Sequence, residues 1–244
     1  MRVNNLDNIK LPLKTDELFR KVDFSSLFST DFKNVKSYEL DIVGLKSTKD
    51  LNEYSNPMFE ITRKFEENQI VLTIDSNIPE PICLIYKLDE DDTFFTNSIK
   101  IEVKEGIKAS LIEVFTNSSK NSAFSVNREF NIDENADFEY AKIQHINESN
   151  SLIYNSVVKQ KDNSKSKFTN FEFGDGLIIN SYENSINNQN IYYNLNGLVK
   201  SVNSANTTNL ISTIHNNESS TSDINYKHSL KDEKKAVFKA KSIV

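Results

Sequence analysis

The sequence has 244 residues, with 29 lysines and arginines against 35 aspartates and glutamates, and a formal net charge of −6. Its basic residues are spread along the chain without a basic stripe interleaved with aromatic residues, which argues against nucleic acid as the main ligand. It contains no run of about 20 apolar residues that would cross a membrane, and residues 1–14 lack the hydrophobic core of a signal peptide. The single cysteine, Cys83, excludes an internal disulfide framework and an internal thiolate cluster. We therefore expect a cytoplasmic protein that does not act on nucleic acid or membranes.

The first 65 residues carry mixed patterns that predict a small α/β region. Asp16 is a candidate N-cap for a short helix over residues 17–21, near which apolar side chains fall three or four positions apart on one face. Residues 25–28 are expected to form a second short turn. Two further stretches are expected to be short strands: 38–43 and 58–64.

From about Gln69 to the C-terminus, apolar residues recur at every second position, as in Ile70, Leu72 and Ile74. This alternation predicts strands with one inward and one outward face. The expected strands are short, about four to seven residues, and are bounded by Asn, Ser, Asp and Gly. No helical pattern of apolar residues continues beyond about residue 65, so the last three quarters of the chain are predicted to be all β.

Many short strands separated by turn residues are compatible with a β-solenoid and with a β-sandwich. Uniform strands without a long Greek-key connection favour a solenoid, whereas the lack of a visible repeat period favours a sandwich. Periodicity alone supports the two architectures equally.

Turn residues are unusual in this sequence, because it has only 5 glycines and 4 prolines. Asn is abundant instead, above all over residues 180–225. Asn tolerates the left-handed backbone conformation because its short polar side chain bonds locally. We therefore expect Asn at turn positions where glycine would be the usual choice.

Several short segments are informative when they are read together and in order. Residues 11–20 read Leu-Pro-Leu-Lys-Thr-Asp-Glu-Leu-Phe-Arg, and residues 111–113 read Leu-Ile-Glu. Residues 131–144 contain Asn-Ala-Asp-Phe-Glu-Tyr followed by Lys-Ile-Gln, and residues 236–244 read Ala-Val-Phe-Lys-Ala-Lys-Ser-Ile-Val. Further matching positions are Gly174-Asp175-Gly176, Leu195-Asn196-Gly197, His215 and Tyr226-Lys227. In this order and spacing, the segments resemble the SufB/SufD family of iron–sulfur cluster assembly scaffold proteins.

The resemblance implies a right-handed parallel β-helix core over residues 66–244, preceded by the mixed α/β region over residues 1–65. It implies a scaffold subunit without an active site of its own. Such a subunit pairs with a SufB-like sister subunit and works with a SufC-like ABC-type ATPase. An iron–sulfur cluster would be held transiently by the complex, and no cofactor is expected on this chain alone.

The chain departs from the family pattern in several ways. Ala240 replaces a glycine that is usual in the last strand. The sequence ends at Val244, before the family's Cys-Ser-His-Gly type motif and helical C-terminal region, so neither cluster ligands nor an ATPase contact can be assigned here. Because matched cysteines are lacking, the resemblance leans toward the SufD-like side of the family.

Two histidines, His215 and His228, are candidate metal ligands on neighbouring expected strands. A metal site needs several ligands that converge on one point, and the additional ligands would have to be Glu218, Asp223 or Asp232. In the alternative interpretation, His215 caps or fills a turn between coils.

Cys83 lies within an apolar stretch, residues 81–86, that has the pattern of a strand. A thiol in apolar surroundings behaves as a small buried hydrophobic group, and burial raises its pKa and makes it inert. We therefore expect Cys83 to be buried and unreactive.

The final strands, residues 215–244, are the expected surface for pairing with the sister subunit. A solenoid has an unpaired strand edge at its end, and a partner subunit would cover that edge. The residues expected at this interface are His215, Tyr226, Lys227, Val237 and Phe238.

A carbohydrate-binding or carbohydrate-active β-helix is the alternative function. Glycoside hydrolysis needs two carboxyl groups that face each other across a cleft, and carboxylate pairs are plentiful in this chain. Against this function, the sequence has no Trp for a sugar-stacking platform. The run over residues 89–92 is expected to be a solvated loop. The remaining pairs are Glu66-Glu67 and Asp133-Glu134.

Overall fold

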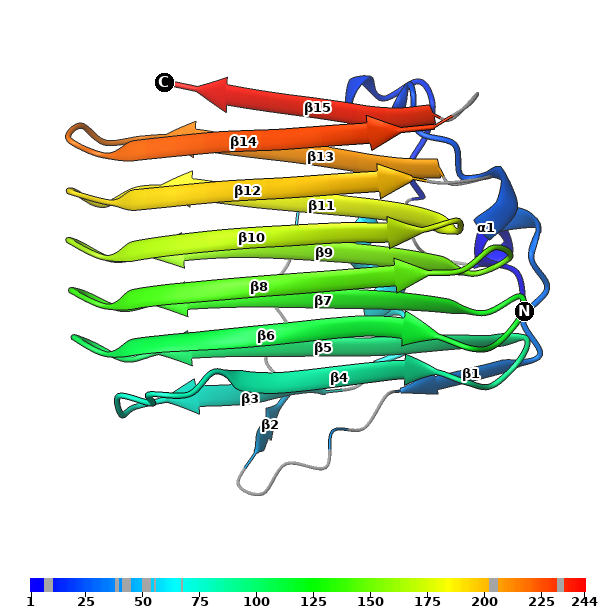
Figure 1. Ribbon diagram of the computed structural model, residues 1–244, viewed down its shortest axis with the longest axis horizontal. Helices are drawn as coiled ribbons and strands as arrows, with labels where there is room; N and C mark the ends of the chain where they lie inside the picture. The colour runs from blue at the N-terminus through cyan, green and yellow to red at the C-terminus, as the bar shows by residue number, and fades with distance from the viewer. Residues whose placement is uncertain are drawn as a thin grey trace.

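The computed structural model describes residues 1–6, 11–37, 40, 45–49, 54, 56–66, 68–201, 206–231 and 235–244. From β3 onward, successive strands alternate between a rear sheet and a front sheet, which are named here for their places in Figure 1. Within each sheet the paired strands are parallel, apart from the antiparallel pair of β2 and β3. The architecture is a parallel β-solenoid of about six turns, so the expected solenoid is confirmed and the sandwich is not observed.

The front sheet has the strand order β14-β12-β10-β8-β6-β4. Its strands are β4 (Ile82–Leu88), β6 (Lys108–Asn117), β8 (Asp137–Ile146), β10 (Lys165–Gly174), β12 (Tyr192–Ser201) and β14 (Thr221–Leu230). The rear sheet has the order β15-β13-β11-β9-β7-β5-β3-β2, with β1 paired to β5. Its strands are β1 (Asn34–Ser37), β2 (Lys46–Thr48), β3 (Gln69–Ile74), β5 (Thr93–Val103), β7 (Ala123–Ile132), β9 (Ser151–Gln160), β11 (Leu177–Ile186), β13 (Asn206–His215) and β15 (Lys235–Ile243).

Each coil of the solenoid takes a nearly constant number of residues. Asp137 lies beside Lys165, 28 positions later, and Lys165 lies beside Tyr192, 27 positions later. Turn residues with φ between 56° and 68° recur at the same spacing: Gly106, Asn135, Asn163, Asn190 and Ser219. Because Gly, Asn and Ser all adopt this conformation here, the repeat is hard to see in the sequence.

The use of Asn at turns is confirmed, since four of the seven described non-glycine residues with positive φ are Asn. The strands are longer than expected, with 10 residues in most of those from β6 onward. The predicted strand length of four to seven residues is wrong because Asn also occupies inward strand positions. Asn180 and Asn209, for example, are fully buried within β11 and β13.

The stretch 58–64, predicted to be a strand, instead forms helix α2 (Met58–Arg63). Its buried residues are Met58, Phe59, Ile61 and Thr62, a spacing that fits one side of a helix. Contacts with the rear sheet hold it in place, because the amide groups of Asn127 and Asn155 donate to carbonyl groups of α2 at 3.1 and 3.2 Å. The prediction failed because these partners lie far along the chain.

The other N-terminal predictions are confirmed in part. Helix α1 (Ser25–Ser29) covers the expected turn, whereas the 3₁₀ helix η2 (Glu17–Phe19) is shorter than the expected helix over 17–21. Asp16 makes no side-chain capping bond, and a short helix without a cap has little to extend it. A further 3₁₀ turn, η1 (Val3–Asn5), begins the chain. The expected strand over 38–43 lies outside the described residues apart from Leu40, and no described helix is long and apolar enough to cross a membrane.

The N-terminal segment packs against the outer face of the rear sheet. One hydrophobic cluster joins Phe19 and Leu27 of this segment to Phe94 and Ile153 of the rear strands. The rear strands are therefore buried on both faces over much of their length. In the front sheet, by contrast, buried residues alternate with more exposed ones. The domain boundary near residue 65 stays a prediction.

Cys83 is exposed, so the expectation of a buried thiol is wrong. Strand β4 alternates, with Leu84 and Tyr86 buried between the sheets and Cys83 and Ile85 on the outer face. The apolar stretch was misleading because its outward residues remain in contact with solvent. Ile85 is 63% exposed.

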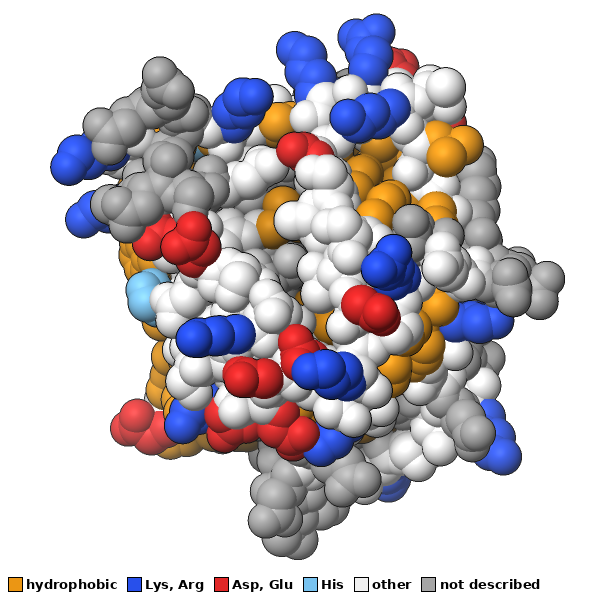
Figure 2. All heavy atoms as spheres, turned by 90° about the vertical axis from the view of Figure 1, so that its right-hand side faces the viewer, with side chains coloured by type: hydrophobic (Ala, Val, Ile, Leu, Met, Phe, Trp, Pro, Cys, Tyr) orange, Lys and Arg blue, Asp and Glu red, His pale blue; other side chains and the backbone are white. Residues whose placement is uncertain are grey.

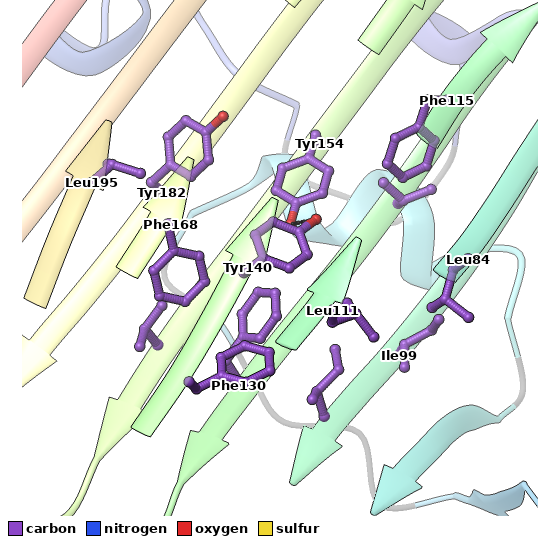
Figure 3. Close-up of a cluster of buried hydrophobic side chains, with 14 of the residues drawn as sticks. Leu84, Ile99, Leu111, Phe115, Phe130, Tyr140, Tyr154, Phe168, Tyr182 and Leu195 are labelled. Carbon is purple, nitrogen blue, oxygen red and sulfur yellow. Dashed lines mark hydrogen bonds between the residues drawn. The ribbon is translucent and has the colours of Figure 1, made fainter. Parts of the chain in front are cut away.

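The core between the sheets encloses an ion pair. Arg128 of β7 and Glu113 of β6 are both 0% exposed, and Arg128 Nε donates to the two Glu113 oxygens at 2.9 and 3.1 Å. The hydroxyl groups of Tyr86 and Tyr140 donate to the same carboxylate. Tyr140 also shares a hydrogen bond with Tyr154, and Figure 3 shows these two rings together among the buried side chains. A buried ion pair is tolerated only when such hydrogen bonds offset its desolvation.

We predict that Glu113→Gln lowers the free energy of unfolding by about 3–5 kcal/mol, because it leaves the Arg128 guanidinium buried without a counter-charge. Adding Arg128→Met to this variant is expected to restore part of the loss. Urea denaturation of the three proteins measures both effects. The matched control is Glu102→Gln, whose surface pairs with Lys100 and Lys104 are expected to contribute less than about 1 kcal/mol. A double variant no more stable than Glu113→Gln would contradict the prediction.

Glu66, which follows α2, gives a pH-dependent prediction. Burial raises the pKa of Glu66 from 4.5 to about 7, against the opposing effect of Ser98 and Arg128. Because the folded pKa is the higher one, the folded state gains relative stability below pH 4.5 and loses it as the pH rises through 7. Glu66→Gln should remove this dependence.

The expected result is that the stability of Glu66→Gln relative to the natural protein rises between pH 5 and pH 8, by at most about 3 kcal/mol. Denaturant titrations at the two pH values measure it. Glu60→Gln, a change of the same kind on α2, is the control. A relative stability that is the same at both pH values would refute the prediction.

Candidate functional site

The two sheets end at β14 and β15, which form the terminal coil of the solenoid. Each is the last strand of its sheet, β14 beside β12 and β15 beside β13. The backbone edges of the terminal coil are therefore unpaired among the described strands, at the top of the solenoid in Figure 1. Apolar side chains are exposed at the same place: Leu230 is 42%, Phe238 43% and Ile243 40% exposed.

An aromatic cluster occupies the space between β14 and β15. The ring centroids of Tyr226 and Phe238 are 5.3 Å apart, and those of His228 and Phe238 are 5.7 Å apart. Partial burial in this cluster lowers the pKa of His228. An uncharged imidazole thus belongs to the apolar surface of the terminal coil at neutral pH.

Tyr226 extends from the terminal coil into the coils beneath it because Gly197 leaves room for its ring. A Cβ atom at Gly197 would lie 2.1 Å from Tyr226 Cε1. The Tyr226 hydroxyl oxygen consequently reaches Asn170, whose Nδ2 donates to it at 3.1 Å. The terminal coil is therefore anchored to the interior by a side chain that crosses one full coil.

A chain of buried polar groups continues from this anchor. Asn209 donates to Glu172 at 2.8 Å and accepts from Asn180 at 3.0 Å, and Asn180 accepts from Lys142 Nζ at 3.1 Å. Lys142 Nζ also lies 3.6 Å from the centroid of the Tyr154 ring. Burial raises the pKa of Glu172 to about 7 and lowers that of Lys142 to about 7. Burial therefore disfavours the charged form of both groups, which lie in an interior lined by amides.

These interior residues were not identified from the sequence. The available signal was the phase of the alternation in β8, where Tyr140, Lys142 and Gln144 share the buried side while Ala141 and Ile143 are partly exposed. A lysine on the buried side of a strand is unusual. Without the strand register, however, the sequence does not indicate which groups across the core contact this lysine.

The structure does not bring the two candidate metal ligands together. His215 Nε2 is 2.8 Å from the Ser222 hydroxyl at the start of β14. His228 lies six residues farther along the same strand, which corresponds to about 20 Å at 3.3 Å per residue. Among the described residues, no group of three or more His, Cys, Asp or Glu side chains is placed to hold a metal ion. Asp232 lies outside the described residues, and Glu218 is exposed.

The five residues expected at a partner interface take different places on the terminal coils. Tyr226 and Phe238 belong to the aromatic cluster, whereas Lys227 is on the outer face of the front sheet. Val237 is half-buried on β15, and His215 ends β13. Their role at an interface stays a prediction.

The carboxylate pairs of the alternative function lie in different surroundings, and Glu67 lies outside the described residues. The run over residues 89–92 is a largely exposed turn, as expected, in which Glu90 pairs with Lys36 and Asp92 with Lys33. A cleft of about 410 Å³ contains Glu102 and Asp133 but has no aromatic lining. Both carboxylates form ion pairs with lysines, Glu102 with Lys100 and Lys104 and Asp133 with Lys161 at 2.7 Å.

Comparison with known protein families gives a match over most of the strands. The family described as "SUF system FeS cluster assembly, SufBD core domain" matches residues 86–244, from within β4 to the last strand. A search of curated proteins finds no match. Because the matched region covers well over half of the chain and coincides with the parallel coils, the chain belongs to the SufBD family and has a role in iron–sulfur cluster assembly by the SUF system.

Proposed function

We propose that this chain is a non-catalytic, SufD-like scaffold subunit that pairs through its terminal coil with a SufB-like sister subunit. The observation that carries the proposal is the combination of two strand edges, unpaired among the described strands, with exposed Leu230, Phe238 and Ile243 on one coil. The iron–sulfur cluster is the cargo of the assembled complex, and a SufC-like ABC-type ATPase is its second partner.

A homologous solenoid is the partner that fits these edges best. It would carry two sheets with the same separation, so that both edges of the terminal coil could extend into it at once by strand addition. The exposed apolar side chains between the edges would then be buried at the junction. A partner with a different cross-section would cover one edge and leave the other open.

The lysines on β15 favour pairing with a specific partner over aggregation through the open strand edge. Lys235, Lys239 and Lys241 lie on this edge strand, and charged residues on an edge discourage aggregation through strand addition. Lys239 already donates to the Glu17 carbonyl oxygen at 2.8 Å. A sister subunit must therefore offer acidic groups near the remaining lysines as well as matching strands.

We predict that the chain co-elutes with a co-expressed SufB-like subunit, and that Leu230→Glu weakens this pairing at least tenfold. Burying a leucine contributes about 1.5–3 kcal/mol, and a buried unpaired carboxylate adds a further cost. Size-exclusion chromatography with light scattering, run with a SufC-like ATPase present, measures the complex. Val35→Glu is the matched control, because Val35 is 38% exposed on β1, which pairs with β5 at the opposite end of the solenoid.

Two results would count against the pairing. One is elution of the chain as a monomer while both partners are folded and present. The other is a Leu230→Glu variant that pairs as well as Val35→Glu. If the sister subunit co-elutes without the ATPase, the ATPase contact is not made by residues 1–244.

A further inference from the structure

The outer face of the front sheet carries a line of hydrophobic side chains that neither the core nor the terminal coil uses. Register pairs them in sequence: Ile85 beside Val114, Val114 beside Ile143, Ile143 beside Phe171, and Phe171 beside Leu198. We call these five residues the apolar ladder. All of them are at least partly exposed. Figure 2 views the molecule from the right of Figure 1, so the front sheet is seen edge-on at the left margin, and hydrophobic side chains lie along this margin.

The apolar ladder runs across the strands of the front sheet. Its five residues lie on successive strands from β4 to β12, so it spans about 19 Å at the usual strand spacing of 4.8 Å. The neighbouring outward positions are also apolar on four of the five strands, with Cys83, Ile112 and Ala141 on one side and Phe173 on the other. The polar neighbours include Thr169 and Asn196 on the first side and Thr116 and His145 on the second. The apolar surface is thus two side chains wide along β4, β6, β8 and β10 and one side chain wide at β12.

Shallow hollows run along one side of the apolar ladder. One, of about 180 Å³, is lined by residues that include Ile112, Ala141 and Thr169. The next, of about 210 Å³, includes Thr169, Phe171 and Gly197. Small side chains next to a hydrophobic ridge leave space for the side chains of a second element.

The charges beside the apolar ladder are unequal on its two sides. Lys200 lies two positions beyond Leu198, and Lys227 continues the ladder on β14. Both are exposed, and neither forms an ion pair with a described residue. The opposite side is mixed, with Glu139 and Lys167 on adjacent strands. A ligand bound on the ladder would therefore meet positive charge near Lys200 and Lys227. On the opposite side it would meet one negative and one positive side chain.

We propose that this face binds an amphipathic α-helix of a partner protein, laid along the solenoid axis with its apolar stripe on the apolar ladder. Acidic side chains on one edge of the helix face Lys200 and Lys227. About 13 helical residues span 19 Å at a rise of 1.5 Å, and the helical repeat of 5.4 Å is close to the 4.8 Å ladder spacing. On one face of an extended strand the side chains repeat about every 6.8 Å, which does not match the 4.8 Å spacing of the ladder.

The test uses fluorescence anisotropy with a synthetic helical peptide of about 14 residues that carries leucines on one face and glutamates along one edge. The expected result is saturable binding that Phe171→Ser weakens at least tenfold. Tyr192→Ser is the matched control, since Tyr192 is exposed on the same face but outside the apolar ladder. Leu230→Glu should leave peptide binding unchanged, which separates this proposal from pairing through the terminal coil.

Charge reversal gives a second arm. The double variant Lys200→Glu with Lys227→Glu should lose affinity for the glutamate peptide and gain affinity for the same peptide with lysines in place of glutamates. A scrambled peptide that binds equally well would overturn the proposal, as would the absence of saturable binding up to about 1 mM (a dissociation constant of 1 mM corresponds to −4.1 kcal/mol). Self-association that is lost in Phe171→Ser would overturn it in favour of a second copy, and binding to vesicles of anionic lipid that is lost in Phe171→Ser would do so in favour of a membrane surface.

Discussion

The constraint on which the structure depends is that each coil must stack on the previous one in parallel register. Once Asp137 lies beside Lys165 and Lys165 beside Tyr192, every residue is placed above a counterpart one coil earlier. Inward positions then form stacks in the core, and outward positions form lines across a sheet. The turns must repeat as well, which is why Asn135 and Asn163 both take a left-handed backbone conformation.

The same stacking explains why polar groups are found deep in the solenoid. A residue facing inward from one sheet meets a residue from the other sheet, as Arg128 of the rear sheet meets Glu113 of the front sheet. Such groups are removed from bulk water, so they must form hydrogen bonds with one another. The interior is consequently ordered by specific hydrogen bonds as well as by hydrophobic contact, and Tyr226 extends this order to the terminal coil by bonding with Asn170. A rigid end with defined strand edges is a suitable property for a subunit of an assembly system.

Much of the fold could be predicted from the sequence because it depends on local patterns. Alternation from Gln69 onward predicts strands, scarce glycine together with abundant Asn predicts the turns, and the order of short segments leads to the SufB/SufD family. Helix α2 (Met58–Arg63) could not be predicted in this way. Its partners Asn127 and Asn155 lie 68 and 97 positions away from the carbonyl groups they bond, and these tertiary contacts favour a helix where local preference was ambiguous.

The candidate sites depended still more on tertiary structure. Cys83 is exposed because the N-terminal segment packs against the rear sheet and not the front one. No local sequence pattern predicts which of the two sheets is covered. The Glu113–Arg128 pair, fifteen positions apart, forms only after the chain has turned from one sheet to the other. By itself, the sequence determined which segments become strands and where most turns fall, because those depend on side-chain alternation and on backbone preference. Only the tertiary structure decided which charges pair, which apolar residues stay exposed and which strand edges remain open, because each of these depends on register and on which face is covered.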